Sequence, residues 1–319
     1  MANTHKGYRT ASVFTEYYLY ILFVFLILRS INVYSLIPSI FDSAVFAFLA
    51  VTGGAMIAWN VVACLRRKSF GLYDWWLLAF LAVMILSSLV NAKYGISGNF
   101  KTIVWSAIYF CIIYALAANG RFTERFYKII ARIFGWSYFL VSLVSFVMYL
   151  IQYSYLRPGT IETRIRIGFL EGRLFGAFGD PNFGGMFALV LIIICTYCLF
   201  ARSDVFPRWF LYVNVPLQIF VLILTGSRSA ILIGEALAAV VLTAVAARSL
   251  AKRGTNVFIN VVASAITLII SVVVLTFFVT ALKWLLEKVP PLFEFLQVHR
   301  PHGQEVVSLK RADVADNGD

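Results

Sequence analysis

Charged residues are scarce in this sequence, and acidic residues most of all. Only 13% of the 319 residues are charged, with 15 Asp and Glu against 27 Lys and Arg, whereas 61% are hydrophobic. A typical soluble domain has about 25% charged residues and about 45–50% apolar ones. Mean hydropathy is accordingly high, at +0.86. This composition excludes a water-soluble protein built around one apolar core and predicts a polytopic membrane protein.

Cysteine and histidine are too few to indicate metal or redox chemistry. The chain has four cysteines and three histidines, and the cysteines lie within or at the ends of apolar segments, where a thiol behaves as a small apolar side chain. Cys195 and Cys198 have C-x-x-C spacing without a nearby histidine, so we interpret them as packing residues. We predict no metal site and no cofactor.

The sequence also lacks a G-x-x-x-x-G-K phosphate loop, which argues against ATP-driven transport by this chain itself.

Long apolar segments recur along the chain, each near the roughly 20 residues that a helix needs to cross a bilayer. They predict an all-α fold, a transmembrane helix bundle of about nine spans. The first segment lacks a small-residue cleavage site, so we expect a retained helix with a cytoplasmic N-terminus. The predicted spans are Tyr17–Leu36, Phe41–Leu65, Trp75–Val90, Ile103–Ala118, Ile129–Tyr153, Phe183–Phe200, Trp209–Thr225, Ala230–Ala247 and Val257–Leu285.

Basic residues occupy every second connection between these spans. Cytoplasmic loops of membrane proteins are enriched in Lys and Arg, so these connections are predicted to be cytoplasmic. The net charge of +12 then reflects topology, and we do not expect a nucleic-acid partner. The basic residues concerned are Lys6, Arg9, Arg66, Arg67, Lys68, Arg121, Arg125, Lys128, Arg202, Arg208, Arg248, Lys252 and Arg253.

Two regions on the opposite, outer side break the pattern of short loops. Residues 1–286 are predicted to form one transmembrane domain that contains an outer loop at 154–182, and residues 287–319 begin a second outer loop. The first loop contains four arginines: Arg157, Arg164, Arg166 and Arg173. Arginine is normally depleted on that side of a membrane, and guanidinium groups bind phosphate in a bidentate manner. An anion site is one interpretation, and pairing of Arg164 and Arg166 with Glu162 and Glu171 is the other.

Asp180-Pro181-Asn182 at the end of this loop is typical of a helix start. Asp caps free backbone N–H groups, and proline suits the first helical position. The positive end of that helix would favour an anion, and Asn182 is a further candidate contact. Nearby glycines would allow close backbone approach: Gly176, Gly179, Gly184 and Gly185.

A second outer turn, between the seventh and eighth spans, contains one more arginine. Arg228 could reach the same anion as the first cluster. Its neighbours Ser227 and Ser229 could donate hydrogen bonds or cap the following helix. The full turn is Thr225-Gly226-Ser227-Arg228-Ser229-Ala230.

These segments together resemble the family of O-antigen ligases and O-antigen and capsular polysaccharide polymerases, bacterial membrane glycosyltransferases. The resemblance rests on Arg173-x-x-Gly176, on Asp180-Pro181-Asn182-x-x-Gly185 and on the Thr225–Ser229 turn, and it covers roughly residues 164–247. It implies a multi-pass enzyme of the bacterial cytoplasmic (inner) membrane. Such an enzyme transfers a glycan from an undecaprenyl-pyrophosphate carrier to a sugar hydroxyl on the outer face, without nucleotide sugar or metal.

The resemblance implies that Arg164, Arg166, Arg173, Arg228 and Asn182 bind the lipid-linked oligosaccharide. Membrane lipids and other polysaccharide-assembly proteins are the expected partners. We favour a polymerase that joins repeat units into capsule, exopolysaccharide or O-antigen. The alternatives are a ligase that uses another acceptor, and a flippase, which would transport the same carrier and would line a central cavity with charge.

The candidate catalytic base lies in the second outer region. His299 and His302 can accept a proton near neutral pH, although a histidine pair in an outer segment can also be merely solvated. Members of the family continue after this loop with further helices, whereas this sequence stops at Asp319. We therefore expect a truncated product, a fragment or a short relative.

Overall fold

The computed structural model describes residues 13–32, 34, 37–67, 72–114, 117, 122–157, 165–252 and 256–296. The described chain is mostly helical and divides into two compact units. The first unit comprises residues 1–26 and 37–130, and the second comprises residues 27–36 and 131–319.

The first unit is a set of apolar helices. Helix α1 (Val13–Arg29) begins in it and ends in the second unit, and α2 (Ser39–Arg67) and α3 (Leu72–Val90) follow. A short 3-10 helix, η2 (Ala92–Tyr94), then leads into α4 (Ile96–Ile108), which continues as a π-helical segment, η3 (Tyr109–Tyr114). The buried Tyr18 hydroxyl donates a hydrogen bond to the Leu49 carbonyl of α2 at 3.0 Å, which satisfies a polar group inside an apolar unit.

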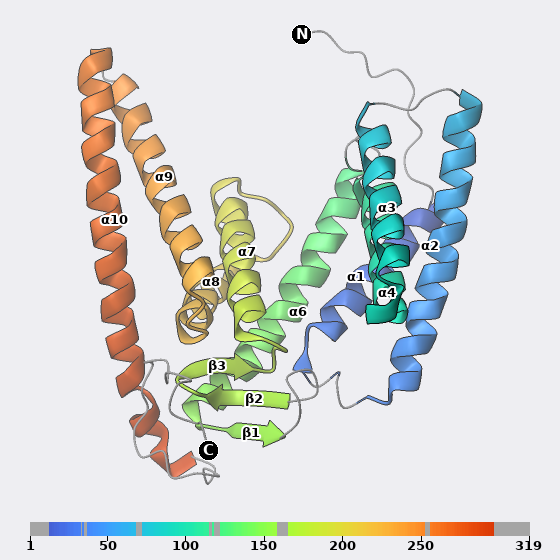
Figure 1. Cartoon of the computed structure of the whole chain (residues 1–319). Helices are drawn as coiled ribbons and strands as arrows, with labels where there is room; N and C mark the ends of the chain where they lie inside the picture. The colour runs from blue at the N-terminus through green and yellow to red at the C-terminus, as the bar shows by residue number, and fades with distance from the viewer. Residues whose placement is uncertain are drawn as a thin grey trace. The chain divides into compact units, whose positions relative to one another are not determined.

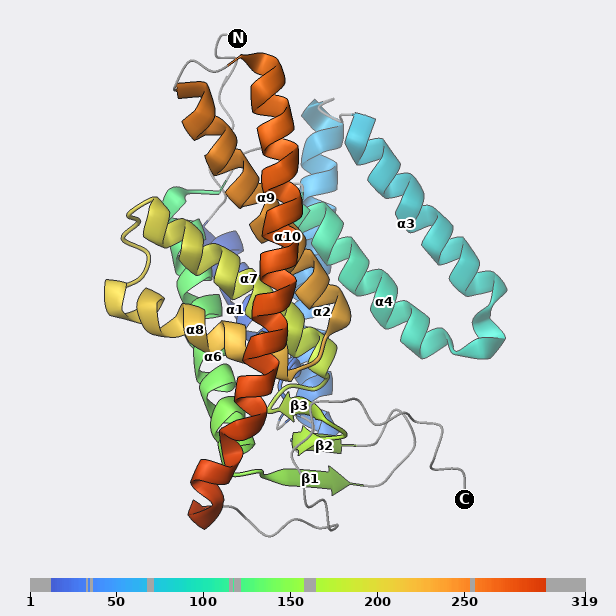
Figure 2. The same cartoon turned by 90° about the vertical axis from the view of Figure 1, so that its left-hand side faces the viewer.

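The second unit contains a small sheet and the helices that follow it (Figures 1 and 2). Helix α6 (Glu124–Leu150) crosses the boundary between the units and leads into the sheet. Helices α9 and α10 lie side by side and antiparallel (Figure 1). The elements after α6 are β1 (Ser154–Arg157), β2 (Ile165–Leu170), β3 (Arg173–Gly176), α7 (Pro181–Phe200), α8 (Arg208–Leu224), α9 (Arg228–Lys252), α10 (Val257–Lys288) and η4 (Pro290–Leu296).

Five of the described helices are long and apolar enough to cross a membrane, as expected of a membrane protein. Two shorter apolar helices cover Trp75–Val90 and Arg208–Leu224. A helix coincides with each of the nine predicted spans, but nine membrane crossings remain a prediction. The five candidate spans are Ser39–Val62, Glu124–Leu150, Pro181–Phe200, Arg228–Lys252 and Val257–Phe293.

The all-α prediction is wrong for the predicted outer loop, which contains a three-stranded antiparallel sheet in the order β1-β2-β3. Strands β2 and β3 are joined by Glu171 and Gly172, both with positive φ (53° and 68°). A two-residue turn of this kind matches the twist of a hairpin. Isoleucine and phenylalanine in β2 fit a half-buried strand.

Aromatic rings fill the core of the second unit. Tyr138 on α6 stacks on Phe187 of α7 with ring centroids 4.2 Å apart, and Phe206 stacks on Phe210 at 4.7 Å. These rings belong to one buried cluster drawn from α6, α7, α8 and the segment after β3. Buried aromatic pairs add packing energy beyond the area they remove from solvent, so this cluster fixes the helices that surround the sheet.

A chain of uncharged polar groups runs through the same core. Ser142 donates to Gln218 Oε1 at 2.9 Å, and Gln218 donates to Asn214 Oδ1 at 2.8 Å. Asn214 in turn donates to Cys195 Sγ at 3.3 Å. Cys195 and Cys198 are buried free thiols of α7, in agreement with their interpretation as packing residues.

Replacing Gly172 by valine should destabilise the hairpin. A β-branched residue in the left-handed region costs about 1–3 kcal/mol, so we expect the apparent melting temperature of the purified protein to fall by about 2 °C or more. Gly172→Asn is the matched control because asparagine tolerates this conformation. Equal melting temperatures for the two variants would contradict the assigned turn.

Candidate functional site

Helix α7 begins where the sequence predicts. Asp180 is the residue before the helix, in extended conformation, and its Oδ1 accepts a hydrogen bond from the backbone N–H of Asn182 at 2.6 Å. Pro181 occupies the first turn, where its missing N–H costs nothing. The prediction of a helix start at Asp180-Pro181-Asn182 is therefore confirmed.

Arg173 connects three segments that are far apart in the sequence. It lies at the start of β3, and its Nε donates to the backbone carbonyl of Thr225 at 2.9 Å. Its Nη2 donates to Asn182 Oδ1, also at 2.9 Å. The guanidinium therefore joins the sheet, the first turn of α7 and the turn between α8 and α9. We call Arg173, Asp180, Asn182 and the turn Thr225–Arg228 the arginine site.

The α8–α9 turn packs directly on the start of α7. A Cβ atom on Gly185 would lie 2.7 Å from Ser227 Cβ and 2.9 Å from Thr225 Oγ1, distances that only a glycine avoids. Gly226 has φ +60°, and its Cβ position faces the Arg173 side chain at 3.6 Å. The close backbone approach predicted for Gly185 is therefore an approach between two segments of the protein.

Two helix N-termini consequently lie next to each other in the arginine site. Helix α7 begins at Pro181 and α9 begins at Arg228, directly after the buried Ser227. Each helix start carries a partial positive charge and backbone N–H groups without helical partners. Arg173 and the exposed Arg228 add two full positive charges, and the half-buried Asp180 contributes one negative charge. The net potential of the site favours an anion.

The segment that follows α1 supports the arginine site from the sheet side. Ile31 forms an isolated antiparallel bridge with Phe178. Asn32 N–H donates to the Ala177 carbonyl at 2.7 Å, and the Asn32 side chain donates to the Arg166 carbonyl. Ala177 N–H donates to Ser145 Oγ of α6 at 2.9 Å. The sequence analysis missed this support, which local patterns do not indicate because it joins residues far apart in the chain.

Arg166 is held by neighbouring groups of the hairpin. Its Nη2 lies 3.3 Å from Glu171 Oε1, and its guanidinium carbon lies 5.2 Å from the centre of the Phe175 ring. The structure thus realises the pairing alternative for Arg166 with Glu171. Its Nε is buried and has no hydrogen-bond partner among the described residues.

Other predicted site residues lie outside the arginine site or outside the described residues. Arg157 is exposed on β1. Arg164, His299 and His302 lie outside the described residues. Over the described ranges, no group of three or more His, Cys, Asp or Glu side chains could hold a metal ion.

Glu235 is a residue that the sequence analysis overlooked. It lies in α9 about two turns beyond Arg228, on the same helix face. Ionisable residues inside a membrane-spanning helix are costly and are functional candidates by default. The sequence feature that could have indicated Glu235 is its position as a single acidic residue within an otherwise apolar segment.

No protein-family model, curated protein or solved structure matches this chain. The resemblance to polysaccharide polymerases and ligases therefore rests on the residues quoted for it.

Arg173→Met should loosen the α8–α9 turn. Loss of two hydrogen bonds from a charged donor, each contributing about 1.5–3 kcal/mol, should raise amide hydrogen exchange across residues 225–231 by about tenfold or more. Arg157→Met is the control because it removes an exposed arginine from the same sheet. Equal exchange in both variants, measured by mass spectrometry, would show that Arg173 does not hold the turn.

Proposed function

We propose that this chain is a membrane glycosyltransferase that joins lipid-pyrophosphate-linked oligosaccharide repeat units into a surface polysaccharide. The observation that carries the proposal is the convergence of Arg173, Arg228 and the N-termini of α7 and α9 at one end of the helices. This arrangement suits a group with several negatively charged oxygens, such as a pyrophosphate.

The proposed chemistry needs a stabilised leaving group. When the acceptor hydroxyl attacks the anomeric carbon, the bond to the carrier oxygen breaks and negative charge grows on the lipid pyrophosphate. Positive groups fixed before the reaction stabilise that charge most effectively. Arg173 is fixed by its bonds to Thr225 and Asn182, whereas Arg228 is exposed and can contact the substrate directly.

A base must remove the proton of the acceptor hydroxyl. His299 and His302 remain our candidates for this role because imidazole titrates near neutral pH. Both residues follow η4, which comes after α10.

The proposed orientation places the arginine site on the outer face of the bacterial cytoplasmic membrane. In this proposal all nine helical segments cross the membrane and the N-terminus is cytoplasmic, as the distribution of Lys and Arg favours. Helices α7 and α9 then both begin at the outer face, and α8, which runs between them, ends there.

The alternatives differ in where charge is needed. A flippase would line a central cavity with charge from several helices, whereas the arginines of the proposed site lie at the start of β3 and at the start of α9, which favours the enzyme. A ligase would use the same arginine site with a different acceptor. We favour a polymerase because no feature of the chain indicates a particular acceptor lipid.

The proposal can be tested on surface polysaccharide from a strain deleted for this gene and complemented with variants. The wild-type chain should restore a ladder of polymer lengths. Arg173→Ala should reduce polymer by about 100-fold, the loss expected for a group that stabilises transition-state charge. Arg173→Lys should rescue poorly because one ammonium group cannot reproduce the planar fork that reaches Thr225 and Asn182.

Arg157→Ala is the matched control and should restore the full ladder. A normal ladder with Arg173→Ala would overturn the assignment of Arg173. If deletion instead stops single repeat units from reaching the surface, the flippase replaces the polymerase.

A further inference from the structure

A second pocket lies at the other end of α7, in the turn that leads to α8. It encloses about 450 Å³ and combines two arginines and a serine with apolar walls. We call it the turn pocket; its lining residues are Cys198, Leu199, Arg202, Ser203, Arg208, Leu211 and Tyr212.

Arg202 occupies a left-handed position at the end of a helix, where glycine is the usual residue. It follows the end of α7 with φ +51°, and Ser203 N–H donates to the Cys198 carbonyl at 3.0 Å while Arg202 N–H donates to Leu199 at 3.4 Å. These bonds form a Schellman motif, whose left-handed position glycine normally occupies. An arginine there is less favourable than glycine, so a use for its side chain would account for its presence.

Within the described parts of the chain, no carboxylate pairs with either guanidinium group of the turn pocket. Arg202 and Arg208 are exposed, and neither side chain has an ion pair or hydrogen bond within the described parts of the chain. Helix α8 begins at Arg208 after Pro207, without a side-chain cap. Its first N–H groups therefore add to the positive potential of both arginines.

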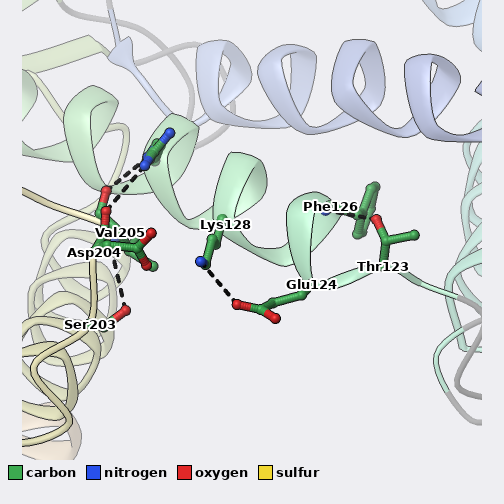
Figure 3. A network of polar contacts seen from close by, with 8 residues as sticks. Thr123, Glu124, Phe126, Lys128, Ser203, Asp204 and Val205 are labelled. Carbon is green, nitrogen blue, oxygen red and sulfur yellow. Dashed lines mark hydrogen bonds and ion pairs between the residues drawn. The ribbon is translucent and has the colours of Figure 1, made fainter.

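The turn that forms the pocket is rigidly anchored (Figure 3). Arg132 of α6 donates from Nε to the Val205 carbonyl at 2.8 Å and from Nη2 to the Asp204 carbonyl at 3.2 Å. Val205 N–H donates to Ser203 Oγ at 3.4 Å, and the buried Phe206 ring packs into the core. The arginines of the pocket are thus presented from a pre-organised backbone.

Exposed aromatic side chains surround the turn pocket. Tyr197 and Phe200 near the end of α7 are 69% and 83% exposed, and Trp209 and Tyr212 at the start of α8 are 56% and 65% exposed. Such residues are enriched where a membrane meets water. Helix α7 has 20 residues and is about 30 Å long, which matches the hydrocarbon thickness of a bilayer. The pocket therefore lies at the membrane surface opposite to the arginine site.

We propose that the turn pocket binds the phosphate of an anionic phospholipid headgroup. Arg202, Arg208 and the start of α8 would hold the phosphate, and Leu199, Leu211 and Tyr212 would contact the glycerol and the first acyl carbons. Basic pockets between membrane helices commonly recognise lipid headgroups in this way. The inference requires a membrane location and is independent of the proposed glycosyl transfer.

The test measures lipid binding to the purified full-length protein. Phosphatidylglycerol is titrated in, and native mass spectrometry records how many lipids are bound. Arg202→Gln combined with Arg208→Gln should weaken binding of the first lipid about 30-fold, since each arginine near a lipid surface contributes about 1 kcal/mol. Arg248→Gln combined with Lys252→Gln is the matched control. It removes two positive charges from the end of α9 and should change binding less than about threefold.

Separate titrations distinguish the sources of phosphate. Phosphatidylcholine and inorganic phosphate should both bind at least about tenfold more weakly than phosphatidylglycerol. Tight binding of inorganic phosphate alone would overturn the lipid assignment. Unchanged phosphatidylglycerol binding in the double variant would overturn the pocket itself. Arg208→Gln alone, at an exposed helix start, provides the same comparison if the double variant does not fold.

Discussion

The hydrogen bonds of one guanidinium group hold the arginine site together. Arg173 lies on a short strand, yet it bonds to a backbone carbonyl between α8 and α9 and to the side chain at the start of α7. Neither acceptor is charged, so the positive charge of Arg173 is not cancelled by these bonds. Because the same group both holds the turn and contributes positive charge, a substitution of Arg173 changes the structure and the electrostatics of this site together.

The packing around Arg173 explains why two helices begin at the same point. Gly185 leaves room for Thr225 and Ser227, which brings the start of α9 against the start of α7. The aromatic core around Tyr138 and Phe187 keeps α6 and α7 together, and the sheet is tied to α6 through Ser145. Each contact is local, but their combined effect is to align two positive helix ends beside two arginines.

Sequence reasoning recovered the helices and the start of α7 because both depend on local patterns: apolar runs of membrane length, and an Asp-Pro-Asn cap. It also selected Arg173, Asn182 and Arg228, which lie in the three segments that the structure brings together. It missed the sheet because β1 and β3 are only four residues each, too short for a clear alternation. It missed the support from Ile31 and Asn32 because these contacts join residues more than 100 positions apart.

The central claim is that the arginine site binds a lipid pyrophosphate and releases it during glycosyl transfer. The most direct measurement is a reaction of the purified chain in lipid nanodiscs with undecaprenyl-pyrophosphate-linked repeat units as both donor and acceptor. Our account predicts polymer of increasing length together with release of the carrier pyrophosphate, and loss of both in Arg228→Ala. If the wild-type chain binds the substrate but releases no carrier pyrophosphate, the account is contradicted.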